Sequence, residues 1–322
     1  MRRRLFILLF LCLAVAGQKC YSQIDSTYIG FFSHELSIRP YFSDSFTALS
    51  CQFGDDDEIT YRPNAPFGLG IGITYKGYSI SGSYGFGFMR DKKKGNTKAT
   101  DFQYHHYGRK FVMDLFFQRY KRFYIERERE VYDLFSDIKL TQYGGFAQYV
   151  FNGNRFSYQA AFDQNQRQLK STGSFLLGGG VYYNKVESDS TLAFNNGAKM
   201  MENVQIGVSL GYAYTWVINK RVYISGSIAV GANLGAEGFD KLGKKEEWKI
   251  YPTVFPRFSA GYNHDNWSLG LSVVNNRVYI LFSDEAKMAF DTGAIQFRFI
   301  KRFDSLESLL TPVFLNKKGQ KK

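Results

Sequence analysis

Residues 68–88 have the sequence GLGIGITYKGYSISGSYGFGF, in which apolar residues recur at every second position. Leu69, Ile71 and Ile73 alternate with glycine, and a second alternating run follows the glycine at position 77. A side-chain period of two predicts strands, and two such runs around a glycine predict a hairpin. The opposite face carries glycine and serine, which would form a poor hydrophobic core. The stretch therefore predicts a transmembrane β-barrel whose apolar face contacts lipid.

The composition supports the same fold class over the whole chain. Aromatic residues make up 18% of the sequence, with 31 Phe and 23 Tyr, and Tyr and Phe favour pleated surfaces. Pro is rare at 6 of 322 residues, as long strands require. The mean hydropathy of −0.29 argues against a helical membrane protein. We therefore predict an all-β protein that forms a single antiparallel transmembrane barrel.

The N-terminus has the pattern of a secretory signal. Three arginines at positions 2–4 precede the apolar run 5–17, which is too short for a comfortable spanning helix. Cleavage is expected after Ser22, with Ala16 or Gly17 as alternative cleavage sites. We therefore expect a signal peptide at 1–22, an N-terminal lead-in at 23–33, an outer-membrane barrel at 34–303 and a polar periplasmic tail at 304–322.

Removal of the signal changes the charge and the cysteine content. Residues 1–22 carry four cations and no acid, so the formal charge falls from +12 to +8. Cys12 and Cys20 leave with the signal, and Cys51 alone cannot form an intramolecular disulfide. The remaining positive charge is dispersed and includes four lysines near the C-terminus. We therefore expect no nucleic-acid partner.

The parity of the connections gives an expected strand count of twelve, within a range of ten to fourteen. Both ends of such a barrel lie in the periplasm, where the turns are short. The turns near Asn219 and Asn263 then fall on the periplasmic side. The count requires 34–53 and 101–121 to be single strands and 122–137 to be a periplasmic connection with a short helix or ordered loop. The expected strands are pairs within 68–88 and within 203–236, and single strands at 34–53, 101–121, 138–151, 155–168, 172–184, 248–262, 266–280 and 288–303.

Three motifs resemble a family of outer-membrane barrels from Bacteroidota known as domain of unknown function 4421. They are Tyr61-Arg62-Pro63-Asn64 followed by Gly68-Leu69-Gly70, then Ser83-Tyr84-Gly85-Phe86-Gly87-Phe88, then Tyr107-Gly108-Arg109-Lys110-Phe111 with Asp114. The resemblance covers about residues 25 to 303 and implies the fold and the location. It implies no catalytic residue and no cofactor. A departure is the 19-residue polar tail after the final strand.

Charged residues on the glycine and serine faces are candidates for the lumen. Buried charges must be paired, so they predict either a plug of ion pairs or a narrow polar channel. The candidate lumenal polar residues are Arg39, His105, Lys110, Asp114, Arg257 and Arg298.

The histidines do not predict a catalytic site. Adjacent His105 and His106 face opposite sides of a strand. Asp114 lies nine residues after His105 and faces the other way in a regular strand, unless Gly108 marks a bulge. A nucleophile would have to come from Ser81 or Ser83 on a neighbouring strand. We therefore predict no catalytic, cofactor-binding or metal-binding residues, because no spaced ligand cluster is present.

Three functional hypotheses remain. The first is a structural, ligand-binding or narrow-channel barrel in the outer membrane of a Gram-negative bacterium. The second is a barrel hydrolase that acts on lipid or peptide. The third, a soluble lipocalin-like barrel, requires an apolar interior and a polar exterior. The expected partners are outer-membrane lipid, the barrel-assembly machinery during biogenesis and a small-molecule ligand that the sequence does not identify.

Overall fold

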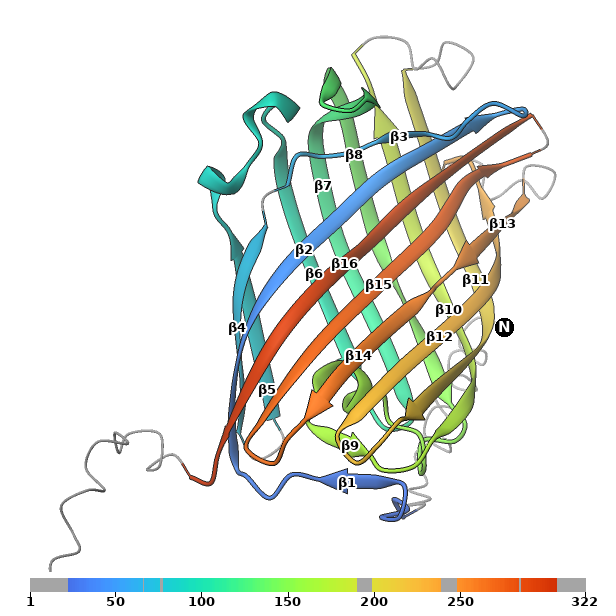
Figure 1. Cartoon of the computed structure of the whole chain (residues 1–322). Helices are drawn as coiled ribbons and strands as arrows, with labels where there is room; N and C mark the ends of the chain where they lie inside the picture. The colour runs from blue at the N-terminus through green and yellow to red at the C-terminus, as the bar shows by residue number, and fades with distance from the viewer. Residues whose placement is uncertain are drawn as a thin grey trace, which may run out of the picture.

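The computed structural model describes residues 23–65, 67–75, 78–189, 199–238, 248–283 and 285–305. Its slanted strands form a barrel (Figure 1). One antiparallel sheet holds fourteen strands, of which β3 and β14 lie beside the main path and leave twelve within it. The path runs β5-β4-β2-β16-β15-β13-β12-β11-β10-β8-β7-β6. The first and last strands of this sheet in chain order, β2 and β16, pair with each other, as barrel closure requires.

The strands are β1 (Ile29–Phe31), β2 (Leu36–Phe53), β3 (Ile59–Tyr61), β4 (Gly68–Tyr75), β5 (Tyr78–Gly85), β6 (Lys98–Tyr107), β7 (Phe111–Glu128), β8 (Val131–Val150), β9 (Gln166–Gln168), β10 (Thr172–Glu187), β11 (Met200–Val217), β12 (Val222–Ala236), β13 (Lys249–Val254), β14 (Arg257–Asn263), β15 (Trp267–Phe282) and β16 (Ala286–Phe303). Two 3-10 turns, η1 (Gly87–Met89) and η2 (Lys92–Lys94), connect β5 to β6. One π-helical turn, η3 (Gln159–Asp163), follows β8. Within the described residues, no helix is long and apolar enough to span a membrane.

On wall strands such as β11 the apolar face points outward, which is the reverse of a soluble barrel. On β11, the outward Ile206, Val208 and Leu210 are 58%, 65% and 62% exposed. The inward Gln205 and Ser209 of the same strand are 2% and 3% exposed. Because a soluble sheet would bury the first set and solvate the second, this pattern is that of a membrane barrel. The lipocalin-like hypothesis is therefore wrong.

The predicted hairpin in residues 68–88 forms as β4 and β5. Leu69 pairs with Tyr84 and Gly70 with Ser83 across it. Leu69, Ile71 and Ile73 are all more than a third exposed, so the apolar face is the outer one. This orientation confirms the interpretation of that stretch as a lipid-facing hairpin.

The twelve-strand count is confirmed, but three assignments were wrong, and the first two of these compensate each other in the count. Residues 101–121 are not one strand, because the chain reverses at residues 108–110 and forms the β6–β7 hairpin. Residues 155–168 are not a wall strand, because they contain η3 and β9. Residues 122–137 form the paired ends of β7 and β8 rather than a helix or a connection. Glu130, with φ of 66°, turns the chain between them.

A plug, which we define as residues 152–168, fills one end of the barrel. Its η3 contacts β6, β12 and β14, which belong to different parts of the wall, so it lies inside (Figure 1). Phe156, Tyr158 and Phe162 of the plug are at most 2% exposed. The expected lead-in 23–33 is also ordered here, since β1 pairs with β9 of the plug.

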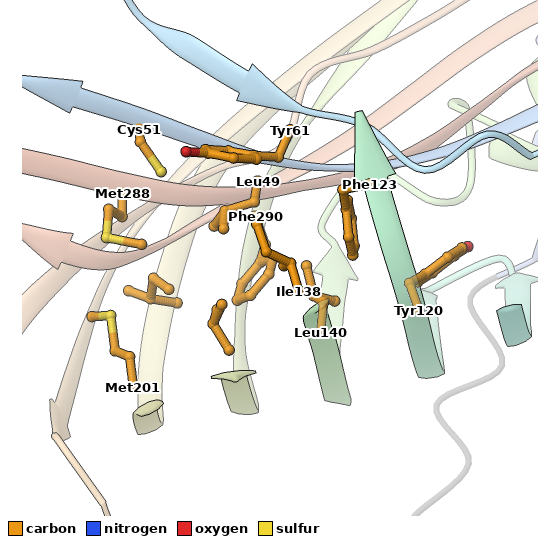
Figure 2. Packing of buried hydrophobic residues seen from close by; sticks show 12 residues of the cluster. Leu49, Cys51, Tyr61, Tyr120, Phe123, Ile138, Leu140, Met201, Met288 and Phe290 are labelled. Atoms are coloured by element: carbon orange, nitrogen blue, oxygen red, sulfur yellow. The ribbon is translucent and has the colours of Figure 1, made fainter. Parts of the chain in front are cut away.

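An apolar cluster, which we call the upper cluster, fills the lumen toward the other end. Figure 2 shows its side chains directed toward one another from several strands. Leu49, Val186 and Phe290 within it are fully buried. The cluster consists of Leu49, Cys51, Tyr61, Tyr120, Phe123, Ile138, Leu140, Val186, Met201, Ile280, Met288 and Phe290. Within the described residues, the interior is therefore packed at two levels.

The outward orientation of β11 leads to a stability prediction. Ile206→Arg should lower the free energy of unfolding by roughly 2–4 kcal/mol if the side chain lies near the bilayer midplane. Ile71→Arg should act in the same direction on β4. Urea unfolding in lipid vesicles, followed by the heat-modifiable gel shift, measures the change. Ser81→Asn on the inner face of β5 is the control and should change stability little. Equal tolerance of all three variants would contradict the assignment of faces.

Candidate functional site

The β6–β7 hairpin brings together two of the candidate residues. His105 lies directly opposite Asp114 in the ladder, and its Nδ1 is 2.7 Å from Asp114 Oδ1. The prediction that Asp114 has the wrong parity to contact His105 is therefore wrong. The parity argument assumed a single strand, whereas residues on two strands of a hairpin share a face when they pair directly.

Arg257 of β14 completes this contact from across the lumen. Its Nη2 donates to Asp114 Oδ2 at 2.5 Å, and both side chains are only 1% exposed. The guanidinium also lies 5.3 Å from the ring centroid of Phe146 and 5.9 Å from that of Tyr107. Ion pairing and cation–π contacts together offset the desolvation of the buried charge. We call His105, Asp114 and Arg257 the lumenal triad.

A second polar group surrounds Asp101, which lies four residues before His105 on β6 and on the same face of the strand. Its carboxylate accepts hydrogen bonds from Tyr120 Oη at 2.5 Å and Gln118 Nε2 at 3.0 Å. Gln118 also donates to Thr47 Oγ1, and Thr292 Oγ1 donates to Gln118. The network crosses the lumen from β7 to β2 and β16, so it ties opposite parts of the wall together.

Arg39 and Arg298 hold the plug rather than line an open channel. Helix-terminal carbonyls lack partners within the helix and attract cations. Here Arg39 Nη1 donates to Asp163 Oδ1 at 3.3 Å and Arg298 Nη1 donates to the Phe162 carbonyl. Arg302 Nη2 donates to the Gln164 carbonyl at 2.7 Å. Three wall arginines therefore cap the end of η3.

The wall has a seam beside the triad. Among the described residues, β5 pairs with β4 alone and β6 pairs with β7 alone, so no ladder joins β5 to β6. His105 faces the lumen yet its side chain is 33% exposed, whereas its partner Asp114 is 1% exposed. The inward face of β6 is therefore accessible at this seam while the inward face of β7 is not.

Five of the six predicted lumenal residues face the interior, and they form two groups. His105, Asp114 and Arg257 form the triad, while Arg39 and Arg298 bind the plug. Lys110 is a correction. It lies in the turn before β7, and its Nζ is 5.9 Å from the ring of Tyr149 on the outer face. Its lumenal assignment failed because the turn at 108–110 ends the strand alternation.

Sequence reasoning missed Asp101 and the bidentate pair of Arg277 with Asp291. Asp101 has the parity of His105 four residues later, which is a signal that could have found it. Arg277 Nε and Nη2 both donate to Asp291, and Nη2 also donates to Glu58 at 3.1 Å. Glu58 comes from a loop, so its arrival in this cluster has no periodic signal.

The triad can orient a base but contains no nucleophile. Asp114 holds the Nδ1 side of the His105 ring, which leaves Nε2 directed elsewhere. Within the described part of the chain, no serine, threonine or cysteine is hydrogen-bonded to His105. In the same part, no group of three or more His, Cys, Asp or Glu side chains could hold a metal ion. No residue set here points to a cofactor.

Comparison with protein families identifies the relatives of this chain. The model of the family described as domain of unknown function (DUF4421) matches residues 23–303. The chain belongs to this family. A search of the curated proteins finds no match to this DUF4421 chain.

Solved structures that resemble the DUF4421 chain include outer-membrane proteins. The outer membrane protease OmpT from Escherichia coli is 6% identical with a TM-score of 0.35, covering 83% of this chain and 96% of that chain. The toluene transporter TodX from P. putida is 8% identical with a TM-score of 0.26, covering 84% and 91%. Ail of Yersinia pestis is 12% identical with a TM-score of 0.19, covering 82% and 99%. At these values no activity is carried over from any of them.

Proposed function

We propose that this chain is an outer-membrane β-barrel of a Gram-negative bacterium that binds a small ligand at the β5–β6 seam. The lipid-facing exterior supports a membrane location, and the run 1–17 with its basic start supports export. Long connections follow β10 and β12 at the end opposite the plug, which supports an extracellular position for that end. The signal segment itself lies outside the described residues.

An open pore along the barrel axis is disfavoured by the packed interior. The plug occupies one end, where Tyr223 Oη and three arginines donate hydrogen bonds to its backbone carbonyls. The upper cluster occupies the lumen toward the other end. A solute would have to displace buried aromatic side chains at both levels, each of which stabilises the fold by about 1.5–3 kcal/mol through burial. Ligand binding therefore fits the structure better than a narrow channel.

The observation that carries the proposal is the seam. Backbone N–H and C=O groups have no water to bond within a bilayer, so unpaired strand edges there require another partner. The facing edges of β5 and β6 are unpaired among the described residues. Gln103 and His105 of β6 bring side-chain hydrogen-bonding groups to the same place. Gln103 Nε2 already donates to Asp101 and His105 Nδ1 contacts Asp114, so a small ligand rich in hydrogen-bonding groups would bond to the strand edges and to the other polar atoms of these two side chains.

Reagent accessibility tests the seam. In a Cys51→Ser background, Gln103→Cys should react with a membrane-impermeant maleimide in isolated outer membranes. Gln118→Cys on the adjacent strand should stay unlabelled, because Gln118 is fully buried. The two substitutions are chemically identical, so the difference reports access alone. Protection of Gln103→Cys to the level of Gln118→Cys would show a closed wall and overturn the proposal.

A hydrolase is the second candidate, because the His105–Asp114 contact is one that catalytic bases use. We propose no hydrolase activity, since the described residues place no nucleophile against the ring and Arg257 already binds the carboxylate. Purified protein in detergent is then expected to release no fatty acid from phospholipid and to leave peptides intact. Release that His105→Ala abolishes would favour the enzyme.

A further inference from the structure

Three lysines lie side by side on the outer face of β6, β7 and β8. Lys98 pairs with Lys121 across one ladder, and Lys121 pairs with Lys139 across the next. Directly opposed like charges destabilise a sheet. The three are at one level of the barrel, close to the end that carries the β7–β8 turn. Glu187 of β10 continues the row beside Lys139, and an anion bound beside Lys98 and Lys121 would relieve the repulsion that remains.

The next two levels below the lysine row extend the pattern. Arg119 lies one level below and sits between Thr100 and Thr141. One further level down, an aromatic row is formed by Phe102, Phe117, Tyr143 and Tyr183. The ring centroids of Phe117 and Tyr143 are 4.7 Å apart, and those of Tyr143 and Tyr183 are 5.7 Å apart. Aromatic rows of this kind mark the membrane–water interface of outer-membrane barrels.

A groove of about 520 Å³ runs along these levels. Its lining includes all three row lysines, Arg119 and the two stacked tyrosines. Arg119 Nε donates to Tyr143 Oη at 2.5 Å, which holds the guanidinium over the aromatic floor. The groove thus joins an apolar floor to a cationic rim.

Nearby carboxylates neutralise only part of this charge. Lys185 Nζ is 3.0 Å from Glu187, and Lys139 Nζ is 3.2 Å from Asp189. Lys98 and Lys121 have no carboxylate within salt-bridge distance among the described residues, and Arg119 bonds to Tyr143 instead. Among the described residues of the groove, the cations without an ion-pair partner are therefore Lys98, Arg119 and Lys121, on two adjacent strands.

We infer that this groove binds the phosphorylated headgroup of an outer-leaflet glycolipid. The inference rests on the proposed membrane location and is independent of the seam ligand. A strand rises about 3.3 Å per residue, so Arg119 and Lys121 lie roughly 7 and 13 Å along the strand beyond the aromatic row. If the aromatic row lies at the edge of the hydrocarbon core, these distances place Arg119 and Lys121 in the headgroup region of the membrane. Phosphate oxygens accept charge-assisted hydrogen bonds from Arg and Lys, while the aromatic floor contacts the first acyl carbons.

Binding of a fluorescent bis-phosphorylated lipid A by the full mature chain in neutral detergent tests the inference. The triple variant Lys98→Gln, Arg119→Gln, Lys121→Gln should bind at least about tenfold more weakly than wild type, because each cation near a lipid surface contributes about a tenfold factor or less. The control Lys220→Gln, Arg221→Gln, Lys301→Gln removes the same charge at the plug end. It should change the affinity less than about twofold.

Further arms identify the source of the phosphate. Dephosphorylated lipid A should bind the wild type as weakly as phosphorylated lipid A binds the groove variant. Inorganic phosphate at millimolar concentration should fail to displace the lipid. Equal loss in both triple variants would mean non-specific charge attraction, and full displacement by inorganic phosphate would mean a free-anion site. Either result overturns the inference. Because the assay is done in micelles, the fractionation of the protein with the outer membrane remains a separate test of location.

Discussion

Asp114→Asn should lower the free energy of unfolding of the barrel by about 3–5 kcal/mol. Among the described residues, Asp114 is the carboxylate paired with the buried Arg257 guanidinium, which also lies against the rings of Tyr107 and Phe146, and the substitution removes this charge. It also removes the acceptor that holds His105 Nδ1. Urea unfolding in lipid vesicles measures the change.

A matched control separates burial from ion pairing as such. Asp133→Asn removes the same charge from the exposed pair with Arg127 near the β7–β8 turn. Exposed pairs contribute about 0–1 kcal/mol, so this variant should unfold close to wild type. The double variant Asp114→Leu, Arg257→Met should recover much of the loss, because apolar residues of similar volume can replace a buried pair. Comparable losses in Asp114→Asn and Asp133→Asn would mean that the triad is solvated.

The fate of His105 in these variants bears on function. Loss of Asp114 frees the ring to move toward the seam, while the seam itself keeps its unpaired edges. Ligand binding that survives Asp114→Asn would assign recognition to β5 and β6 alone. Ligand binding lost together with stability would make the triad part of the recognition surface. Only this second result would link the triad to the seam between β5 and β6.

The sequence determines the wall of this barrel more clearly than its contents. A period of two is a local property, and it correctly assigned Leu69, Ile71 and Ile206 to the lipid-facing side. The plug shows the limit of that signal. Phe156, Tyr158, Ala160 and Phe162 also alternate, yet they lie buried in the plug, and Ala160 and Phe162 belong to the π-helical turn η3. These side chains alternate because they pack against wall residues on different sides of the plug. A local period of two cannot distinguish such packing from a strand.

The candidate site depended on one turn that carries a weak signal. Residues 108–110 are Gly-Arg-Lys, without the Asn-Gly or Asp-Gly pair that marks most two-residue hairpins. Missing that turn placed residues 101–121 in a single strand, in which His105 and Asp114, nine residues apart, would face opposite sides. The contact between Asp114 and Arg257 could not be predicted from the sequence for a different reason. The two residues are 143 positions apart in sequence and meet across the lumen. Pairing of that kind is set by the closure of the barrel.

Phe162→Ala in the plug should lower the free energy of unfolding by about 3–5 kcal/mol. Phe162 is 2% exposed, and its ring stacks on Tyr107 of the wall at 5.2 Å between centroids. It also lies 5.7 Å from the ring of Tyr158 within the plug. Removing the ring leaves a cavity that the surrounding strands cannot fill, since the barrel fixes their spacing.

Phe31→Ala is the control for the plug, because Phe31 lies on β1 of the same small β1–β9 sheet but is 61% exposed. It should change stability by less than about 0.5 kcal/mol. Planar-bilayer recordings provide a second measurement on the same proteins. Phe162→Ala should remain non-conducting even though the plug is loosened, because the upper cluster around Leu49 and Phe290 still fills the lumen. Steady conductance in Phe162→Ala would mean that the plug alone closes the barrel, and it would restore the narrow-channel hypothesis over ligand binding at the wall.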